Sequence, residues 1–404
     1  MLTYIYTARD PKSGQKITAE VEAENEATAT RLLVERGWAP LELKVKGEEN
    51  GLRSIFNRIP GKQRIIFSRQ LATLVNAGLP LVQSLSSVET QMTNKPLKEI
   101  IGKVIKDVEA GSSLANAMAK HPKIFNDVYV SLVAAGEASG TLDTSLERLA
   151  NQQEKDAEIM SRVRSAFIYP IIVIFVLIAV VLFMMTSVLP QVQNLYSSIP
   201  GAELPFMTRI LLGLTHAVTH FWWITIVIVV GAAFFGTRYA RTGPGKQLVD
   251  RIKLRMWPAS NLFTELYMAR FARAAATLVA SGVPIIKMLS TSAQAVGNVQ
   301  IENAINKAAE DVKGGKPLSD SLAKDPNFPD LVSGMIRVGE QSGQLEGMFT
   351  KLADYYEKEV DNQVKSISTI IEPALMVVVG VIALVVVAAV LLPIYSLAGK
   401  NLQI

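Results

Sequence analysis

The residues whose spacing is most typical of a metal site are His216 and His220, which stand four positions apart. On a helix this spacing places both imidazoles on one face. Two histidines underfill a tetrahedral shell, however, and no carboxylate lies near them in the sequence. Trp222 and Trp223 follow at once, as in the aromatic belt at a membrane surface. We therefore interpret the two histidines as polar interfacial residues and predict no metal site.

Other patterns that carry chemistry are missing from the sequence. The chain has 404 residues, no cysteine and three histidines, which excludes disulfides, thiolate metal sites and cysteine nucleophiles. No phosphate-binding G-x-x-x-x-G-K-[ST] loop occurs, and Gly243-Pro244-Gly245-Lys246, the nearest match, lacks the upstream glycine. Serine-hydrolase and zinc-protease signatures are absent as well. The sequence predicts a protein that is not an enzyme, with no catalytic residues and no cofactor. The mild net charge of +5 does not favour a nucleic-acid partner.

Apolar residues make up 49% of the chain and charged residues only 19%, and the apolar excess lies in three stretches without any charge. A bilayer core requires about 20 apolar residues on a helix. We predict membrane-spanning helices over residues 168–190, 211–236 and 373–395, the second of which reaches this length only with its more polar start. The alternative is that these stretches are buried core helices. The segment Val377 to Leu392 is apolar on nearly every face, which disfavours that alternative.

Basic residues near the ends of these stretches indicate the orientation of the chain. Lys155, Arg162 and Arg164 precede the first span, whereas only Arg209 lies between the first and the second. Further bases follow the second span at positions 238, 241, 246, 251, 253 and 255, and Lys400 follows the third. We therefore predict a multi-pass membrane protein with a cytoplasmic N-terminus, a short external loop at 191–210, a basic cytoplasmic linker at 237–265 and an external C-terminus at 396–404.

The sequence contains an internal repeat. Phe67 to Val88 and Phe271 to Ser292 are identical at ten of 22 positions, at a constant offset of 204. The segment GEASGTL at Gly136 is matched by GEQSGQL at Gly339, now at an offset of 203. A repeat this long indicates a duplicated domain, each copy followed by a membrane helix. The second span has no counterpart in the repeat, and we interpret it as the helix that returns the chain to the cytoplasm.

Both copies show helical periodicity, so we expect a mainly α fold with two cytoplasmic bundles of about six helices each, over residues 62–165 and 266–371. The N-terminal residues 1–46 differ. Alternation at Tyr4 to Ala8 and Ile17 to Ala23 predicts a hairpin, Glu26 to Arg36 a helix, and Leu41 to Val45 a further strand. This small α+β segment is followed by a polar linker at 47–61.

The turns that occur in both copies supply the candidate structural or partner-contact residues. In Gly78-Leu79-Pro80 and Gly282-Val283-Pro284, we expect the glycine to end one helix and the proline to stand just inside the next. The glycines of the G-E-x-S-G-x-L turns favour a tight helix–helix elbow, in which the glutamate caps the following helix or pairs with a base. Direct binding of a partner is the other interpretation. These turns contain Gly136, Glu137, Gly140, Gly339, Glu340 and Gly343.

The starts of two spans contain the remaining candidates. Pro170 and Pro373 occupy equivalent positions, and Glu372 stands directly before the second of them. A carboxylate at membrane depth is costly, so Glu372 is either a helix-end residue at the interface or part of an interhelical contact. The small residues Gly380, Ala383, Ala388 and Ala389 allow close helix approach in the third span, with ordinary packing as the equal alternative.

Taken together, these motifs resemble the GspF/PilC family of inner-membrane platform proteins from type II secretion systems and type IV pili. The paired F-x-R-x-x-x-T-L-V-x-[AS]-G-[LV]-P segments and the paired G-E-x-S-G-x-L turns carry the resemblance. Ile371-Glu372-Pro373, Leu392-Pro393-Ile394-Tyr395 and the opening Tyr4-Ile5-Tyr6-Thr7-Ala8-Arg9 extend it over the whole chain.

The resemblance implies a part of an assembly machine in the inner membrane. It implies contacts with a cytoplasmic hexameric ATPase, with prepilin or pseudopilin subunits, with other inner-membrane assembly components and with the lipid bilayer, as well as self-association. A membrane permease or transporter subunit is one alternative, but three spans with almost no polar residues offer no substrate path. A membrane protease that processes prepilin is another, but it would need paired carboxylates near the membrane, and Glu372 is alone.

Overall fold

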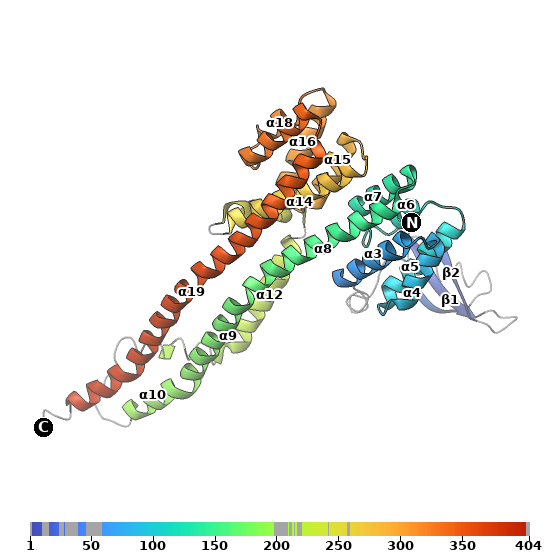
Figure 1. Cartoon of the computed structure of the whole chain (residues 1–404). Helices are drawn as coiled ribbons and strands as arrows, with labels where there is room; N and C mark the ends of the chain where they lie inside the picture. Colours follow the sequence, from blue (N-terminus) through green and yellow to red (C-terminus); the bar gives the residue numbers. More distant parts are fainter. Residues whose placement is uncertain are drawn as a thin grey trace. The chain divides into compact units, whose positions relative to one another are not determined.

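The computed structural model describes residues 2–9, 16–23, 28, 39–45, 59–197, 209, 212–213, 215, 220–240, 242–256 and 259–400 (Figure 1). The chain divides into two compact units. One contains Met1–Pro60 with Asn94–Leu97, and the other contains Gly61–Thr93 with Lys98–Ile404.

The N-terminal residues form a three-stranded antiparallel sheet in the order β2-β1-β3. Its strands are β1 (Leu2–Arg9), β2 (Lys16–Ala23) and β3 (Ala39–Val45). Leu2 pairs with Ala23 across β1 and β2, and Tyr4 pairs with Val45 across β1 and β3. The strands cover the alternating segments of the sequence. The predicted helix at 26–36 lies outside the described residues apart from Thr28, which is helical, and the predicted linker lies outside them up to residue 58.

Six helices follow in the first bundle, which we define as residues 61–166. They are α3 (Gly61–Asn76), α4 (Leu81–Gln91), α5 (Lys95–Glu109), α6 (Leu114–Ala119), α7 (Asp127–Ser139) and α8 (Leu142–Ala166). Local chemistry sets their ends. The Ser113 side chain accepts a hydrogen bond from the Asn116 N–H, and the Asn126 side chain accepts one from the Tyr129 N–H, so each caps the helix that it precedes.

The second bundle repeats this order of helices. It contains α14 (Ser260–Ala280), α15 (Ile285–Val296), α16 (Val299–Lys313), α17 (Leu318–Leu322), α18 (Asp330–Ser342) and the first part of α19 (Leu345–Lys400). The cores correspond too: the rings of Phe67 and Phe125 lie 5.9 Å apart in the first bundle, and those of Phe271 and Phe328 lie 5.9 Å apart in the second. The mainly α fold and the duplication of the bundle are confirmed.

The last helix of each bundle continues into an apolar segment. After a single turn residue, α8 is followed by α9 (Ile168–Phe183), a π-helical turn at Met184–Val188 and α10 (Leu189–Ser197). Helix α19 runs for 56 residues without a break (Figure 1). The stretches Leu142–Gln191 and Leu345–Ala388 are long and apolar enough to cross a membrane, and their most apolar windows are only 6% and 0% buried. That exposure argues against soluble core helices.

This continuity differs from the expected separation of bundle and span around residues 371–373. Pro373 lies inside α19 and costs the helix one backbone donor, but it does not end the helix. In the first copy the helical path is interrupted at Phe167, whose N–H bonds to the Arg164 carbonyl three residues back, at 3.1 Å. The helix α19 also includes residues 396–400 of the predicted external tail, and residues 401–404 lie outside the described part.

The predicted second span at 211–236 is only partly described. Its second half is the apolar helix α12 (Trp222–Ala240), and before residue 220 the structure describes only isolated positions. The second span therefore stays a prediction, as does most of the loop at 191–210. The segment predicted as a basic linker contains a helix, α13 (Gly243–Arg255).

The two bundles meet in a small apolar core. Ile159 on α8 packs with Leu262 and Leu266 on α14 and with Val360 and Ile367 on α19, and each is at most 7% exposed. We call these five residues the junction cluster. Val163, Val364 and Ile371 pack against it. An ion pair between Arg162 on α8 and Asp361 on α19 lies beside the cluster.

Truncation of the junction cluster should destabilise the protein. Leu266→Ala removes a side chain that is 5% exposed and leaves a cavity, so we expect the free energy of unfolding to fall by about 2–5 kcal/mol. Chemical unfolding of the purified protein in detergent measures the change. Leu331→Ala on α18, where the leucine is 40% exposed, is the matched control and should change stability by less than about 0.5 kcal/mol. Equal effects of the two substitutions would contradict the assignment of a core at this place.

Candidate functional site

No group of three or more histidine, cysteine or acidic side chains arranged for a metal ion occurs among the described residues. His216 lies outside them, so the interpretation of His216 and His220 as interfacial residues stays a prediction. The structure instead gives the repeated turns a clear geometry.

The glutamates of the G-E-x-S-G-x-L turns cap short helices. Glu137 accepts hydrogen bonds from the N–H groups of Leu114 at 2.5 Å and Ala115 at 2.9 Å, at the start of α6. The backbone N–H groups of a first helical turn have no partner within the helix, and a carboxylate also suits the positive end of the helix dipole. The sequence predicts a cap on the following helix. The capped helix is the preceding one, because α7 folds back beside α6.

Glu340 repeats the arrangement in the second bundle. It accepts hydrogen bonds from the Leu318 N–H at 2.6 Å and from the Ser319 N–H at 3.2 Å, at the start of α17. The Ser319 hydroxyl donates a third bond at 2.6 Å. Each glutamate therefore fastens the helix that contains it to a short helix about twenty residues earlier in the chain.

The glycines of the same turns are required by close contacts and by the backbone. A Cβ atom added to Gly136 would lie 2.6 Å from the Ser145 hydroxyl, and one added to Gly339 would lie 3.1 Å from the side chain of Leu345. Larger residues would therefore separate α7 from α8 and α18 from α19. Gly140 and Gly343 end α7 and α18 at a φ of +72°, in the left-handed region that favours glycine.

The turns between the first two helices of each bundle are equivalent as well. Gly78 and Gly282 have φ values of +83° and +75°. Pro80 and Pro284 occupy the N-cap positions of α4 and α15, one residue before the expected place inside the helix. Their surroundings differ, however. All four residues are exposed, but Gly282 and Pro284 also line a pocket of about 580 Å³ together with Ala134 and Ala138 of α7.

The candidate residues at the starts of the predicted spans do not lie in the repeated turns. Pro170 is buried in the first turn of α9, and Glu372 and Pro373 are exposed on α19. The Glu372 side chain forms no hydrogen bond or ion pair with any residue in the described part of the chain, so neither interpretation of this carboxylate is tested. A Cβ atom added to Gly380 would meet nothing within 4 Å, and the close helix approach considered at this residue is not used among the described residues.

Two arginines of the repeated motif have a role that the sequence analysis missed. Arg69 Nε donates to Glu154 on α8, and Arg273 Nε donates to Glu357 on α19, each at 2.7 Å. Both arginines are in the F-x-R motif, and both glutamates obey the repeat offset, so comparison of the two copies could have found these ion pairs. The hydrogen bond from Arg69 lowers the pKa of Glu154, and the same bond raises the pKa of Arg69. These pairs tie the first helix of each bundle to the last.

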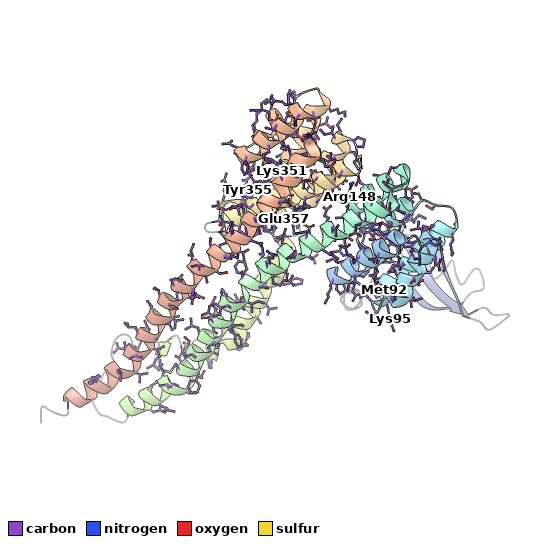
Figure 2. All side chains as sticks on the ribbon, in the orientation of Figure 1. Met92, Lys95, Arg148, Lys351, Tyr355 and Glu357 are labelled. Carbon is purple, nitrogen blue, oxygen red and sulfur yellow. The ribbon has the colours of Figure 1, made fainter. Side chains whose placement is uncertain are left out.

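A further arginine joins the two bundles. Arg148 on α8 donates hydrogen bonds to the Ala280 carbonyl and, at 3.5 Å, to the Ser281 hydroxyl, where α14 ends (Figure 2). A cation there is favoured by the helix dipole. The equivalent residue in the second bundle, Lys351, is exposed on α19 (Figure 2). The two copies therefore share their internal contacts and differ in their outer surfaces.

Glu265, on α14, is an acidic side chain in a poorly compensated environment near the junction cluster. Desolvation raises its pKa to about 7, and the negative charge of Glu359 contributes to the rise. Gln363 donates one hydrogen bond to its Oε1 atom at 3.3 Å, while its Oε2 atom is buried without a described partner. The ionised form is therefore disfavoured where α14 packs on α19.

We expect the cap glutamates to contribute to stability. Glu340→Ala leaves two backbone N–H groups without an acceptor and should cost about 1–3 kcal/mol, and Glu137→Ala should behave similarly. Thermal or chemical unfolding in detergent measures the loss. Glu310→Ala is the control, because its ion pair with Lys313 spans 3.8 Å and is 76% exposed at the glutamate, so less than about 0.5 kcal/mol should be lost. If Glu340→Ala or Glu137→Ala lowers the stability no more than Glu310→Ala does, the structural role of the turn is contradicted.

We also expect Glu265 to make stability depend on pH. A carboxyl whose pKa is raised on folding contributes stability that is complete below its ordinary pKa of 4.5 and is lost as the pH rises through about 7. Glu265→Gln should therefore gain relative to the wild type between pH 5 and pH 8, by roughly 2 °C in Tm. Glu310→Gln should show no such gain. A constant difference between Glu265→Gln and the wild type across this range would refute the expectation.

Comparison with known proteins places these features in a family. The family described as "Type II secretion system (T2SS), protein F" matches twice, over residues 67–190 and 271–393, and its N-terminal domain matches residues 1–44. The two matches each cover a bundle together with the apolar segment that follows it. The two matches to one family model therefore agree with the duplication seen in the structure.

Relatives of similar length agree. The chain is 40% identical to a type IV pilus assembly protein PilC of Thermus thermophilus, over 99% of both chains. It is 36% identical to a PilC of Myxococcus xanthus, over 96% of this chain and 93% of the relative. It is 32% identical to a type II secretion system protein F of Pseudomonas aeruginosa, over 98% of this chain and 99% of the relative. The chain is a membrane protein, and it belongs to the GspF/PilC family, the family of type II secretion system protein F.

Proposed function

We propose that this chain is the inner-membrane platform of a type IV pilus or type II secretion machine. In this role it couples a cytoplasmic hexameric ATPase to the insertion of pilin or pseudopilin subunits into a fibre. The proposal is supported by full-length relatives that are named for pilus assembly and for type II secretion. The observation that carries it furthest is the continuity of each bundle with an apolar helix, because a bundle moved by a partner would move that helix with it.

Helix α19 is the most direct mechanical connection. Its 56 residues correspond to about 84 Å at 1.5 Å per residue, from Leu345 in the second bundle to Lys400. The ion pairs of Arg273 with Asp354 at 2.6 Å and Glu357 at 2.7 Å hold its cytoplasmic part to α14. A displacement of the second bundle is therefore expected to tilt or rotate α19 as one body instead of being absorbed at a loop.

The proposed topology has three spans in the inner membrane, with the N-terminus and both bundles in the cytoplasm and the C-terminus outside. The excess of lysine and arginine next to the cytoplasmic ends supports it. In this arrangement the bundles are available to an ATPase, and the spans can contact prepilin helices and other inner-membrane components. Self-association of the chain is part of the proposal.

The chain itself is proposed to have no enzymatic activity, so the energy for assembly comes from the partner. A permease is less well supported, because the uncharged segments at 168–190 and 373–395 offer few polar side chains for a substrate. The candidate residues of the repeated turns are proposed to act in this role by fixing the shape of each bundle.

Deletion of the gene tests the proposal. We expect loss of the fibre, or of secretion, while prepilin is still cleaved, because the chain would act after processing. Electron microscopy and immunoblotting measure the two outcomes. Complementation with the wild-type gene should restore fibres, and so should the surface variant Leu331→Ala as a matched control. Accumulation of uncleaved prepilin would overturn the platform role in favour of a processing enzyme.

A biochemical experiment tests the proposed coupling to the ATPase. The full chain in lipid nanodiscs should hydrolyse no ATP alone, and it should bind the ATPase of the same operon or change its turnover. The Arg273→Ala variant, which loses the ion pairs that tie α19 to α14, should bind the ATPase and transmit less of the effect. Absence of both binding and stimulation by the wild type would contradict the coupling role.

A further inference from the structure

Helix α13 exposes an apolar stripe to solvent. Leu248, Ile252 and Met256 are 49%, 48% and 50% exposed. They stand four residues apart along α13 and the residue that follows it, so they lie on one face. Three large apolar side chains aligned in this way, on a short helix that also carries several charges, are typical of a helix that contacts another surface.

Basic residues flank the stripe. Arg251 and Arg255 are exposed, and neither forms an ion pair with a residue in the described ranges. Lys246 is exposed too, but it stands two residues from Leu248 and therefore lies on the other side of the helix. The positions of Arg251 and Arg255 border the stripe on one side of the helix, because each precedes an apolar member by one residue. The fourth base, Lys253, is paired with Asp250 at 3.2 Å. An apolar stripe bordered by unpaired bases is complementary to a surface with an apolar interior and negatively charged groups on top of it.

The opposite face of α13 is fixed to the second bundle. Asp250 is 2% exposed, and its Oδ2 atom accepts a hydrogen bond from the Val299 N–H at 3.1 Å, at the start of α16. The Asn298 side chain donates to the Asp250 carbonyl at 3.3 Å. Asp250 stands two residues from both Leu248 and Ile252, which is about 200° around a helix. The stripe therefore faces away from the bundle.

The start of α13 is held against the end of α12. The Thr242 hydroxyl donates to the Tyr239 carbonyl at 2.7 Å and accepts from the Gly245 N–H at 3.4 Å. A Cβ atom added to Gly245 would lie 1.9 Å from the Tyr239 carbonyl oxygen, so only glycine permits this turn. Helix α13 thus begins directly where the apolar helix α12 ends.

We propose that α13 lies on the bilayer as an interfacial helix, with Leu248, Ile252 and Met256 inserted among the lipids and Arg251 and Arg255 on anionic phospholipid headgroups. The proposal rests on the proposed crossing of the membrane by α12. The apolar face of such a helix enters the boundary between headgroups and acyl chains by about 5–10 Å. Because α13 is fixed to α16, this contact sets the distance of the second bundle from the membrane.

Single-cysteine labelling tests the proposal, since the natural chain contains no cysteine. The full chain carrying Ile252→Cys, Val227→Cys on α12 or Val338→Cys on α18 is labelled with an environment-sensitive fluorophore. The original side chains are 48%, 62% and 53% exposed. Each protein is reconstituted into vesicles of phosphatidylcholine and phosphatidylglycerol that contain acyl-brominated lipid. We expect quenching and a blue shift at positions 252 and 227, and neither at position 338.

The outcomes separate this inference from the proposed function. Quenching at 227 together with a signal at 252 equal to that at 338 would overturn the interfacial helix while leaving the span in place, and it would mean that a protein partner or water covers the stripe. No quenching at 227 would overturn the span and the inference with it. The paired substitution Arg251→Gln and Arg255→Gln, or omission of phosphatidylglycerol, should reduce quenching at 252 and leave 227 unchanged. Quenching at 252 that is indifferent to both changes would refute the role of the anionic headgroups.

Discussion

The junction cluster is the contact on which the arrangement of the second structural unit depends. Ile159 belongs to the last helix of the first bundle, whereas Leu262 and Val360 belong to the first and last helices of the second. Each bundle has its own aromatic core and would be a small independent domain without this contact. Burial of the shared apolar surface removes that independence, because separating the bundles would expose side chains that are now at most 7% exposed. The position of the cluster, at the point where α8 and α19 leave the bundles, also holds the two long helices together where they turn apolar.

Duplication explains why the two bundles can be alike inside and different outside. The caps by Glu137 and Glu340 and the ion pairs of Arg69 and Arg273 are contacts within one copy, and they recur in both. The contact that Arg148 forms between the copies does not recur, since each bundle offers the other a different face. Arg148 binds the end of α14, and its counterpart Lys351 is exposed. Such head-to-tail packing leaves one face of each bundle without its equivalent partner, which is where a platform has surface available for other components.

The sequence predicted most of the fold because its strongest signals are local or repeated. Helix periodicity, the left-handed glycines and the uncharged stretches each depend on neighbouring residues, and the offset between copies paired the turns correctly. The direction of the Glu137 cap was not predictable in the same way, because a carboxylate before one helix can reach another that folds beside it. The unbroken course of α19 through Pro373 is not predictable from the proline, because a proline is typical of a helix start and here the helix continues across it. The sequence predicts a linker where α13 lies, because its many charged residues outweigh the three apolar residues of the stripe.

The balance between rigid and adjustable parts follows from these contacts. Helix α19 is continuous, and the ion pairs of Arg273 hold its first part to α14, so the second bundle sets the direction of the whole helix. The path of the first copy is different, since it is interrupted at Phe167 and contains a π-helical turn at Met184–Val188. Breaks of this kind are where a helix bends, because their hydrogen bonds are shifted from the regular pattern. A load applied to the bundles would therefore be carried straight by α19 and be accommodated by α9 and α10. Two copies of one module thus provide one straight helix and one helical path that can bend. The two copies differ in this respect in their apolar segments and not in their bundles.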